Sequence, residues 1–260
     1  MTLPTSSSVS HSSPCQARIA VLGCQSGYPT AILSAPRYHV IDNARPFRDR
    51  RTAGAVLARD LDGYREHPDT VVLGLARGGV PVGREVATRL RVPLEVCVVR
   101  KLGTPQWPEL AMGAVATGGA VVLNDDVMGG LGLSDDQVRE VVERETAELR
   151  RRERAYRGER AALDLAGRTV ILVDDGIATG ASMVAAARSV RGAGPARVII
   201  GSPVGPRNVC RTLAAEADEV VCSIVPRDFR AVGQAYVDFH QMTDDEVRAA
   251  LFSSWSRPRR

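Results

Sequence analysis

The feature that most restricts how this chain can fold is the run VILVDDGIATGAS at residues 170–182. Residues 170–173 form a short, continuous aliphatic segment, which is typical of a strand buried on both faces of a parallel sheet. Asp174 and Asp175 follow directly. Open α/β sheets bind their ligands at the carboxyl ends of their strands, so the sequence places two neighbouring carboxylates where a ligand would lie.

The turn after the two aspartates has the composition of a phosphate-binding loop. Gly176 and Gly180 permit backbone conformations that expose N–H groups, and Thr179 and Ser182 add hydroxyl donors. A helix expected over about 182–191 would direct its positive amino terminus to the same place. The pattern predicts a seat for one phosphate, with the carboxylates nearby for a sugar diol or a cation. The alternative interpretation is a buried strand followed by an ordinary acidic turn.

This run resembles the phosphoribosyl-pyrophosphate (PRPP) signature of type I phosphoribosyltransferases. The resemblance implies that Asp174 and Asp175 hold the ribose 2′- and 3′-hydroxyls, that Asp175 is catalytic, and that the following turn wraps the 5′-phosphate. Many family members carry an aliphatic residue at the position of Gly176, so we expect this glycine to loosen the turn without removing a ligand. The residues assigned to ribose and 5′-phosphate binding are Asp174, Asp175, Gly176, Ile177, Ala178, Thr179, Gly180, Ala181 and Ser182.

A second glycine-rich turn, Arg77-Gly78-Gly79, follows a predicted buried strand at residues 70–75. Adjacent glycines let backbone N–H groups point at an anion, and the Arg77 guanidinium suits phosphate oxygens. A Rossmann dinucleotide site is disfavoured because the GxGxxG order is absent and the next predicted strand ends in Arg100 rather than an acidic residue. Type I phosphoribosyltransferases carry a pyrophosphate loop in this place. The resemblance therefore assigns to pyrophosphate binding Ala76, Arg77, Gly78 and Gly79.

Lys101 is the only lysine among the 34 basic residues of the chain. Its ammonium can swing on its stem and lose its proton, which a guanidinium cannot. In orotate-type family members, basic residues on a flexible loop close over pyrophosphate, so the resemblance implies that role for Arg100 and Lys101, with Lys101 catalytic. The run that follows resembles a lid, in which Glu109 could accept a proton from the incoming base, as lid glutamates do in adenine-type members. A surface lysine and a capping glutamate are the alternatives.

Strand-like and helix-like segments alternate along the chain, which predicts the α/β class. We expect a mostly parallel sheet of about four to five strands with helices on both faces. The resemblance implies a type I phosphoribosyltransferase-like core with a small hairpin or lid and a hood. The length of 260 residues favours one domain with tails. The expected parts are a disordered leader at 1–35, a phosphoribosyltransferase-like domain at 36–252 and a basic tail at 253–260.

Hydrophobic periodicity and turn residues divide the domain into elements. Strands are predicted at 70–75, 94–99, 170–173, 197–200 and 219–224, with an antiparallel pair at 112–116 and 120–123. Helices are predicted at 52–64, 81–90, 182–191 and 208–215. A long charged helix is expected after a capping box of Ser134 and Gln137. Residues 201–206 and 229–239 are expected near the site of the acceptor.

The composition disfavours several other classes of function. Only 4% of residues are aromatic, and the longest charged stretch, 139–160, alternates arginine with glutamate, which is typical of a solvated helix rather than a nucleic-acid-binding surface. The five cysteines and four histidines show no metal-site spacing, and the odd number of cysteines favours free thiols in a reducing compartment. No apolar stretch reaches transmembrane length. We therefore expect a cytoplasmic protein that binds neither nucleic acid nor membrane.

The resemblance implies a Mg²⁺-dependent enzyme. It implies transfer of a phosphoribosyl group from PRPP to a small-molecule nitrogen acceptor, a nucleobase or related amine, with release of pyrophosphate. Mg²⁺ would be held mainly by substrate oxygens and water, with Asp174 and Asp175 as neighbours through water. Family members are commonly dimers, so the resemblance also implies a homodimer.

The sequence does not specify the acceptor. In 6-oxopurine members of the family an aspartate serves the purine at the position of Ala178, so hypoxanthine and guanine are disfavoured as acceptors. A regulatory PRPP sensor on the same fold, without turnover, is the alternative function. A P-loop nucleotide hydrolase is disfavoured because the GxxxxGK[ST] pattern is absent.

Overall fold

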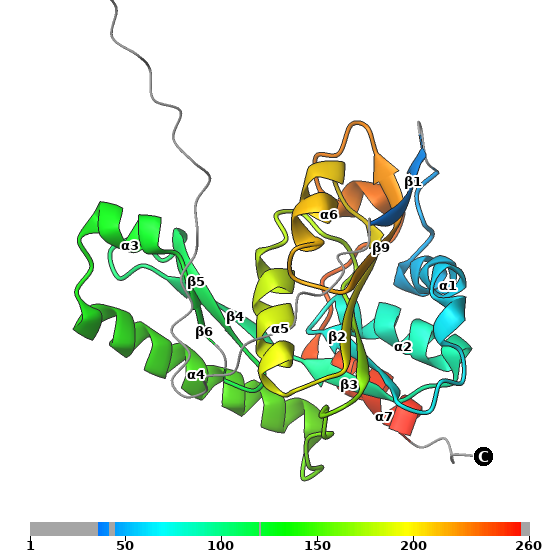
Figure 1. Ribbon diagram of the computed structural model, residues 1–260, viewed down its shortest axis with the longest axis horizontal. Coiled ribbons are helices and arrows are strands. Elements are labelled where there is room, and N and C mark those ends of the chain that lie inside the picture. Colours follow the sequence, from blue (N-terminus) through cyan, green and yellow to red (C-terminus); the bar gives the residue numbers. More distant parts are fainter. Residues whose placement is uncertain (1–35, 42–44, 120, 256–260) are drawn as a thin grey trace, which may run out of the picture.

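The computed structural model describes residues 36–41, 45–119 and 121–255. Within these residues, six parallel strands form the central sheet (Figure 1). In sheet order the strands are β1 (Arg37–Ile41), β9 (Glu219–Pro226), β8 (Arg197–Val204), β7 (Thr169–Val173), β2 (Thr70–Leu75) and β3 (Leu94–Cys97). The α/β class and the mostly parallel sheet are confirmed. The sheet is wider than predicted because β1 pairs with β9 at one edge.

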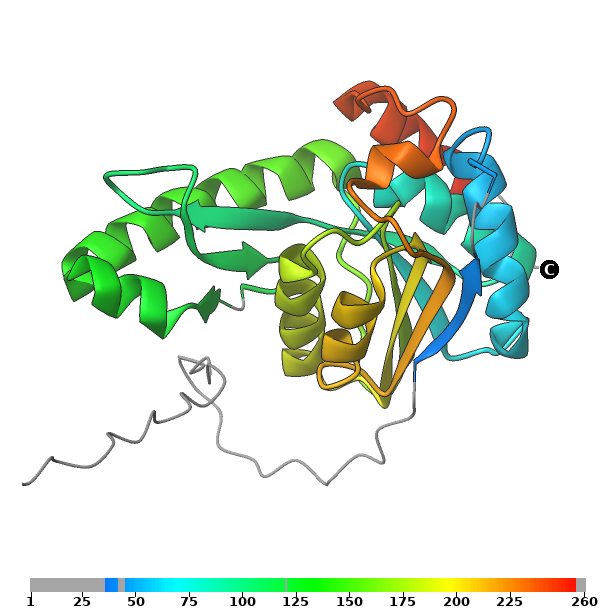
Figure 2. The same ribbon diagram turned by 90° about the horizontal axis from the view of Figure 1, so that it is seen from above.

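Helices cover both faces of this sheet, as expected (Figures 1 and 2). One face carries α1 (Arg50–Asp60), α2 (Gly79–Leu90) and α7 (Asp244–Trp255), and the other carries α5 (Ala181–Gly192) and α6 (Arg207–Leu213). Successive strand side chains point to opposite layers: Val170 packs with residues of α5 and α6, whereas Ile171 packs with residues of α1, α2 and α7. Burial of these two apolar layers holds the helices on the sheet.

A separate three-stranded antiparallel sheet extends to one side of the core (Figure 2). It consists of β4 (Val99–Gly103), β5 (Ala111–Ala116) and β6 (Val121–Leu123), and it continues into α3 (Asp125–Leu131) and α4 (Asp135–Arg157). We call residues 99–157 the arm. The predicted antiparallel pair is confirmed for β5 and β6. Gly118 and Gly119, at φ of 95° and 84°, make the turn between them, and Ala120 lies outside the described residues.

The predicted single strand at 94–99 is wrong, because β3 ends at Cys97 and the chain then enters the second sheet. Val98 is held by Thr117: its N–H donates to the Thr117 hydroxyl at 2.8 Å, and its carbonyl accepts from the Thr117 N–H at 2.8 Å. These bonds draw the chain away from the main sheet. Arg100 and Lys101 therefore lie in the arm and not at the carboxyl end of a core strand.

The capping box that was predicted for the charged helix is present at the start of α4. The Ser134 hydroxyl accepts from the Gln137 N–H at 3.3 Å, and the Gln137 side-chain oxygen accepts from the Ser134 N–H at 3.0 Å. Arginine–glutamate pairs follow on the exposed face, including Arg151 and Arg152 with Glu148. The helix is thus a solvated, ion-paired element, as its charge pattern indicates.

Several predicted boundaries shift in the structure. The helix predicted from Pro81 begins at Gly79, so the proline lies within its first turn. Strand β8 continues to Val204, so most of the segment 201–206 is buried strand, and its place near the acceptor stays a prediction. Two further elements are the 3₁₀ turns η1 (Asp62–Tyr64) and η2 (Val232–Ala235). Helix α7 was not predicted and extends beyond the expected boundary at 252; the leader at 1–35 and residues 256–260 lie outside the described residues.

Cys97, Cys210 and Cys222 are free and buried, as predicted, while Cys15 and Cys24 lie outside the described residues. Over the part of the chain that the structure describes, no helix combines the length and the apolar character that a membrane crossing requires.

Candidate functional site

The two glycine-rich turns singled out in the sequence lie side by side. Strands β2 and β7 are parallel neighbours, with Gly74 opposite Val173, so the turns at 76–79 and 174–180 meet at one edge of the sheet. From β2 the chain continues outward to β3, and from β7 it continues in the opposite direction to β8 and β9. This reversal of strand order is where open α/β sheets bind ligands.

The glycines of the first turn serve close packing rather than unusual backbone angles. A Cβ atom on Gly78 would lie 2.0 Å from the Oδ2 of Asp175, and one on Gly79 would lie 2.4 Å from the Val173 carbonyl oxygen. Gly78 has φ of −62° and ψ of −32°, which any residue adopts. The two close approaches show that the turn packs directly against the Asp-Asp pair. The peptide bond between Ala76 and Arg77, at the start of the turn, is cis.

The Asp175 carboxylate is fixed by an arginine that the sequence reasoning did not identify. The Arg50 Nε donates to the Asp175 Oδ2 at 2.8 Å, and both side chains are largely buried, with 9% and 13% exposed. The Arg50 Nη1 also donates to the His240 carbonyl oxygen at 2.9 Å. The Tyr236 hydroxyl donates to the Asp175 carbonyl oxygen at 2.5 Å. Arg50 is one of many arginines and lies at an ordinary helix start, so no local signal distinguished it.

Asp174 has a different environment from Asp175. Its Oδ1 accepts from the Asp175 N–H at 2.9 Å, and no ion pair joins it to another described residue. Burial raises the pKa of Asp174 well above its ordinary value, and the neighbouring charge of Asp175 raises it further. Burial also raises the pKa of Asp175, although the hydrogen bond and the charge of Arg50 oppose that shift. The surroundings of Asp174 thus disfavour its charged form, which a bound cation would stabilise.

A cavity of about 310 Å³ opens at this point. It joins Arg77, Gly78 and Asp175, which the sequence predicted, to residues that it did not. The full lining is Arg50, Arg77, Gly78, Asp175, Phe239, His240, Gln241 and Met242. Four of these belong to residues 238–246, which we call the C-terminal segment. Phe239 lies at the end of the region that was expected near the acceptor, and it lines this cavity; a role in acceptor binding stays a prediction.

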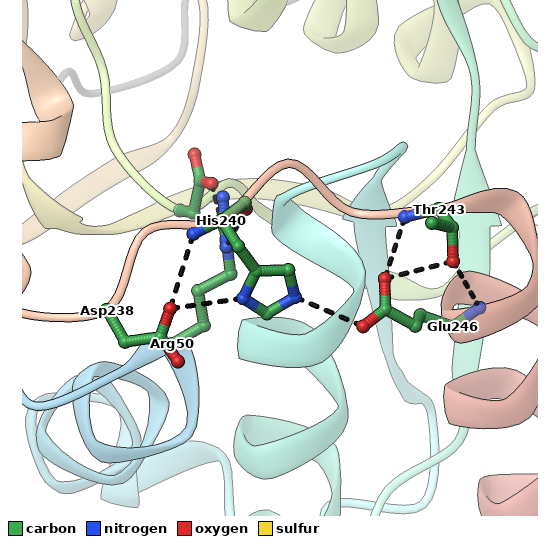
Figure 3. Close-up of polar contacts among 6 residues, drawn as sticks. Arg50, Asp238, His240, Thr243 and Glu246 are labelled. Carbon is green, nitrogen blue, oxygen red and sulfur yellow. Dashed lines mark hydrogen bonds and ion pairs between the residues drawn. The ribbon is translucent and has the colours of Figure 1, made fainter.

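The C-terminal segment is itself braced by polar contacts (Figure 3). The His240 ring lies 3.1 Å from Asp238 through Nδ1 and 3.1 Å from Glu246 through Nε2. Glu246 in turn accepts from the N–H of Thr243 at 2.8 Å. Arg50 approaches the same segment from α1, as Figure 3 shows.

The predicted phosphate turn is open over part of its length. Ala178, Thr179, Ala181 and Ser182 are exposed. Gly180 has φ of 80° and is the amino-terminal cap of α5, so the glycine is required there. The N–H groups of 178–180 donate to no other described residue. Exposed hydroxyls, unpaired N–H groups and a helix amino terminus therefore face the same region.

Two residues of this turn serve packing instead. Ile177 is buried, with 3% exposed, and its N–H donates to the Val204 carbonyl oxygen at 2.9 Å. A Cβ on Gly176 would lie 2.3 Å from the Cγ1 of Val232. The expectation that Gly176 loosens the turn is wrong, because Val232 fills the space that a side chain at this position would take.

The residues predicted for the lid lie together but away from the cavity lining. Arg100 pairs with Glu145 of α4 at 2.6 Å. The Lys101 ammonium donates to the Glu109 carbonyl oxygen at 3.0 Å and lies 3.6 Å from the Glu109 carboxylate, which is fully exposed. Trp107 is also exposed. The structure thus joins Lys101 to Glu109, and their roles in catalysis stay predictions.

Comparisons with known proteins agree with this arrangement. The family described as the phosphoribosyl transferase domain matches residues 51–240. Two proteins of Mycobacterium tuberculosis, from strains H37Rv and CDC 1551, are provisionally named phosphoribosyl transferases and are each 47% identical over 205 residues. The match covers 79% of this chain and 46% of each relative, so the chain spans about half the length of these curated relatives.

A solved structure is similar over nearly its whole length. The crystal structure of TT1426 from Thermus thermophilus is 45% identical, with a TM-score of 0.69, and the match covers 81% of this chain and 99% of that one. The family match includes both glycine-rich turns, Arg77 and the Asp-Asp pair. On this match, which extends over well more than half of the sequence, the chain belongs to the phosphoribosyl transferase family.

Proposed function

We propose that the protein transfers a phosphoribosyl group from PRPP to a nitrogen acceptor, a nucleobase or related amine, and releases pyrophosphate. The observation that carries this proposal is the junction of the two turns, in which Gly78 lies against the Asp175 carboxylate beside a cavity that Arg77 also lines. Family membership supports phosphoribosyl transfer as the general reaction. A homodimer in the cytoplasm is part of the same proposal.

Each part of PRPP has a counterpart in this arrangement. Asp174 and Asp175 would accept hydrogen bonds from the ribose hydroxyls, and the open turn from Ala178 to Ser182 would donate to the 5′-phosphate. Arg77 is about one-third exposed and lies 3.9 Å from Asp244, so its guanidinium is loosely held and available to pyrophosphate. Holding the reactants in place and stabilising the departing charge would supply most of the catalysis.

The donor set fits a hydrated Mg²⁺ ion. Within residues 36–41, 45–119 and 121–255, no three metal-ligating side chains come together, so a cage made by the protein alone is not available there. Asp174 and Asp175 offer adjacent carboxylates, which suits an ion held mainly by substrate oxygens and water. Such an ion, when bound, would offset the negative charge of pyrophosphate.

We assign Arg100, Lys101 and Glu109 to a later stage of the reaction. All three lie in the arm, and Lys101 and Glu109 contact each other at its surface. They would reach the substrates only after the segment between β4 and β5 moves toward the cavity. In that position Lys101 would neutralise pyrophosphate and Glu109 would accept a proton from the acceptor.

The test is PRPP uptake followed by turnover. Calorimetry with PRPP and Mg²⁺ should detect binding, and a panel of nucleobases and amines should identify an acceptor through pyrophosphate release. Asp175→Asn should then lower turnover by about 100-fold or more, because it removes a charge that contacts the ribose. Asp62→Asn, at an exposed position in η1, is the matched control.

The possible results separate the alternatives. Absence of PRPP uptake by the unmodified protein would contradict the proposal. Uptake of PRPP without turnover of any acceptor would favour the PRPP-sensing function instead. Wild-type turnover in Asp175→Asn would show that the site has been placed wrongly.

A further inference from the structure

Arg50 is a buried arginine that the proposed reaction does not yet use. It is the first residue of α1 and is 8% exposed, and among the described residues only Arg157 is a comparably buried arginine. Arg157 pairs with Glu95 inside the core, whereas Arg50 lines the cavity. An arginine is rarely buried unless its guanidinium is paired. The contacts of Arg50 therefore indicate which groups it holds in place.

These contacts join two walls of the cavity. The Nε of Arg50 donates to the Asp175 Oδ2 at 2.8 Å, at the end of β7. Its Nη1 donates to the His240 carbonyl oxygen at 2.9 Å, in the C-terminal segment. Its guanidinium carbon lies 4.2 Å from the centre of the Phe239 ring, so the side chain also stacks on that segment. One residue of α1 thus links the proposed ribose site to the chain that covers it.

The orientation of the Asp175 carboxylate follows from this link. Gly78 leaves room for Oδ2 on one side, since a Cβ at this position would lie 2.0 Å from it, and the Arg50 Nε holds the same oxygen. No described side chain donates a hydrogen bond to the other oxygen, Oδ1, and we assign this oxygen to a ribose hydroxyl. A planar guanidinium can make the two directed hydrogen bonds and the ring contact at once, whereas lysine offers a single nitrogen.

We propose that Arg50 is a positioning residue of the PRPP site, which orients the Asp175 carboxylate and at the same time holds the C-terminal segment over the cavity. The inference rests on the proposed function. It predicts that one side chain, that of Arg50, controls both the orientation of Asp175 and the position of the C-terminal segment.

The experiment compares Arg50→Met and Arg50→Lys with the unmodified protein. Arg50→Met should weaken PRPP binding, measured by calorimetry with Mg²⁺, by about tenfold or more, because a charged hydrogen bond to Asp175 is lost. It should also speed amide hydrogen exchange in residues 238–246. Arg50→Lys should restore part of the PRPP affinity through its charge but little of the exchange protection, since it cannot keep both hydrogen bonds and the stacking.

Arg51→Met is the matched control. Arg51 is the next residue of the same helix, its side chain is 84% exposed, and it lies 3.5 Å from Glu85. This variant should change neither PRPP affinity nor exchange in the C-terminal segment. Wild-type PRPP affinity and unchanged exchange in Arg50→Met would overturn the inference.

Two further measurements distinguish failure of this inference from a failure to fold and from failure of the proposed function. If Arg50→Met fails to fold, the double variant Arg50→Met, Asp175→Asn removes the unpaired buried charge. Its C-terminal segment should still exchange faster than that of Asp175→Asn alone, and equal exchange would contradict the proposal. If the unmodified protein takes up no PRPP, the proposed function fails, while the exchange comparison still decides whether Arg50 holds the segment.

Discussion

Gly176 and Val232 share one space at the edge of the phosphate turn. A Cβ on Gly176 would lie 2.3 Å and 2.8 Å from the two methyl carbons of Val232. Val232 belongs to η2 and packs with Phe47 and Tyr236, which are buried beside it. The position of the turn is therefore set in part by a residue from the end of the chain, through contact alone.

Gly176→Ala should destabilise the protein, because the new methyl group and Val232 cannot both fit. We expect a loss of about 1–3 kcal/mol in the free energy of unfolding, the usual cost of overpacking. Val232→Ala in the same chain should recover much of that loss, since the effects of substitutions at contacting residues on the free energy of unfolding are not additive. Urea unfolding of both single variants and the double variant measures the coupling.

Gly63→Ala is the control for this pair, since a Cβ at Gly63 meets nothing within 4 Å. Its free energy of unfolding should stay within about 0.5 kcal/mol of the original value. If Gly176→Ala lowers the free energy of unfolding equally in the original chain and in the Val232→Ala variant, the two residues do not compete for space.

At this scale the sequence identified residues with a local pattern and missed those without one. Asp174, Asp175 and Gly78 lie in recognisable strand-to-helix turns, so they could be found. The sequence could not show why position 78 must be glycine, because the Asp175 carboxylate that leaves no room for a side chain comes from a distant turn. Arg50 has no pattern of its own, and only the fold brings it to Asp175.

The C-terminal segment contains a histidine that lies between two carboxylates, Asp238 and Glu246. The hydrogen bond with Asp238, and then that with Glu246, raise the pKa of His240 above its ordinary value of 6.5. The pKa of Asp238 is lowered, chiefly by the side-chain hydrogen bond with His240, and that of Glu246 is lowered, chiefly by the N–H of Thr243. The segment is tightest when the imidazole is protonated and both carboxylates are ionised.

The segment should therefore loosen as the pH rises. A raised pKa in the folded state means that the contribution of His240 is fully present below 6.5 and is lost as the pH passes through the higher folded value. The carboxylate contributions are present above their unfolded pKa values and are lost as the pH falls through the lowered folded values. A proton NMR titration of His240 should give a midpoint above 6.5, and hydrogen exchange in 238–246, corrected for the intrinsic pH effect, should rise through that midpoint.

His240→Gln should remove this pH dependence, because glutamine does not titrate. The same change at exposed His67 is the control and should leave the segment unaffected. A midpoint for His240 at or below 6.5 would show that the two carboxylates do not bind its protonated form.

The start of α7 carries a sequence pattern that predicts a helix. Thr243 and Glu246 have the spacing of a capping box, and the structure has both of its hydrogen bonds at the start of α7, 2.8 Å and 3.2 Å long. The same signature at Ser134 led to the correct prediction of α4. What no local pattern could supply is the contact of the segment with α1, since that depends on how the chain returns to the sheet.

Across the whole molecule, the arm is joined to the core by a buried ion pair. The Arg157 Nε, at the end of α4, donates to the Glu95 carboxylate of β3 at 3.2 Å, and the two side chains are 10% and 8% exposed. Arg157 also donates to the Val96 carbonyl oxygen at 3.2 Å. Nearby, the Tyr156 hydroxyl donates to Asp244 at 2.7 Å, so the same end of α4 also reaches α7.

Arg157→Met should lower the free energy of unfolding by about 3–5 kcal/mol, because it leaves the Glu95 carboxylate buried without its cation. Adding Glu95→Gln should recover most of the loss, since the amide keeps an oxygen for the Val96 N–H, which donates to Glu95 at 2.7 Å. Urea unfolding measures each variant. Arg154→Met, at an exposed position of the same helix, should have little effect, and a similar loss in both helix variants would argue against a special role for the buried pair.

The overall architecture could be predicted because strand and helix patterns alternate and the strands are continuously apolar. The edge strand β1 and the separate sheet of the arm could not, because both depend on pairing between distant segments. Val98 is the clearest case: its sequence continues a strand, and only its two hydrogen bonds with Thr117 end it.

The cavity is lined by Arg50 near the start of the described chain, by the turns after β2 and β7 in the middle, and by residues 239–242 close to its end. These stretches meet only after the intervening loops have closed, which is the slow part of folding in proteins with many long-range contacts. No fragment shorter than residues 50–242 contains the whole lining. During synthesis, a ribosome-bound chain that stops before Phe239 would contain all the strands but would lack four residues of the cavity lining.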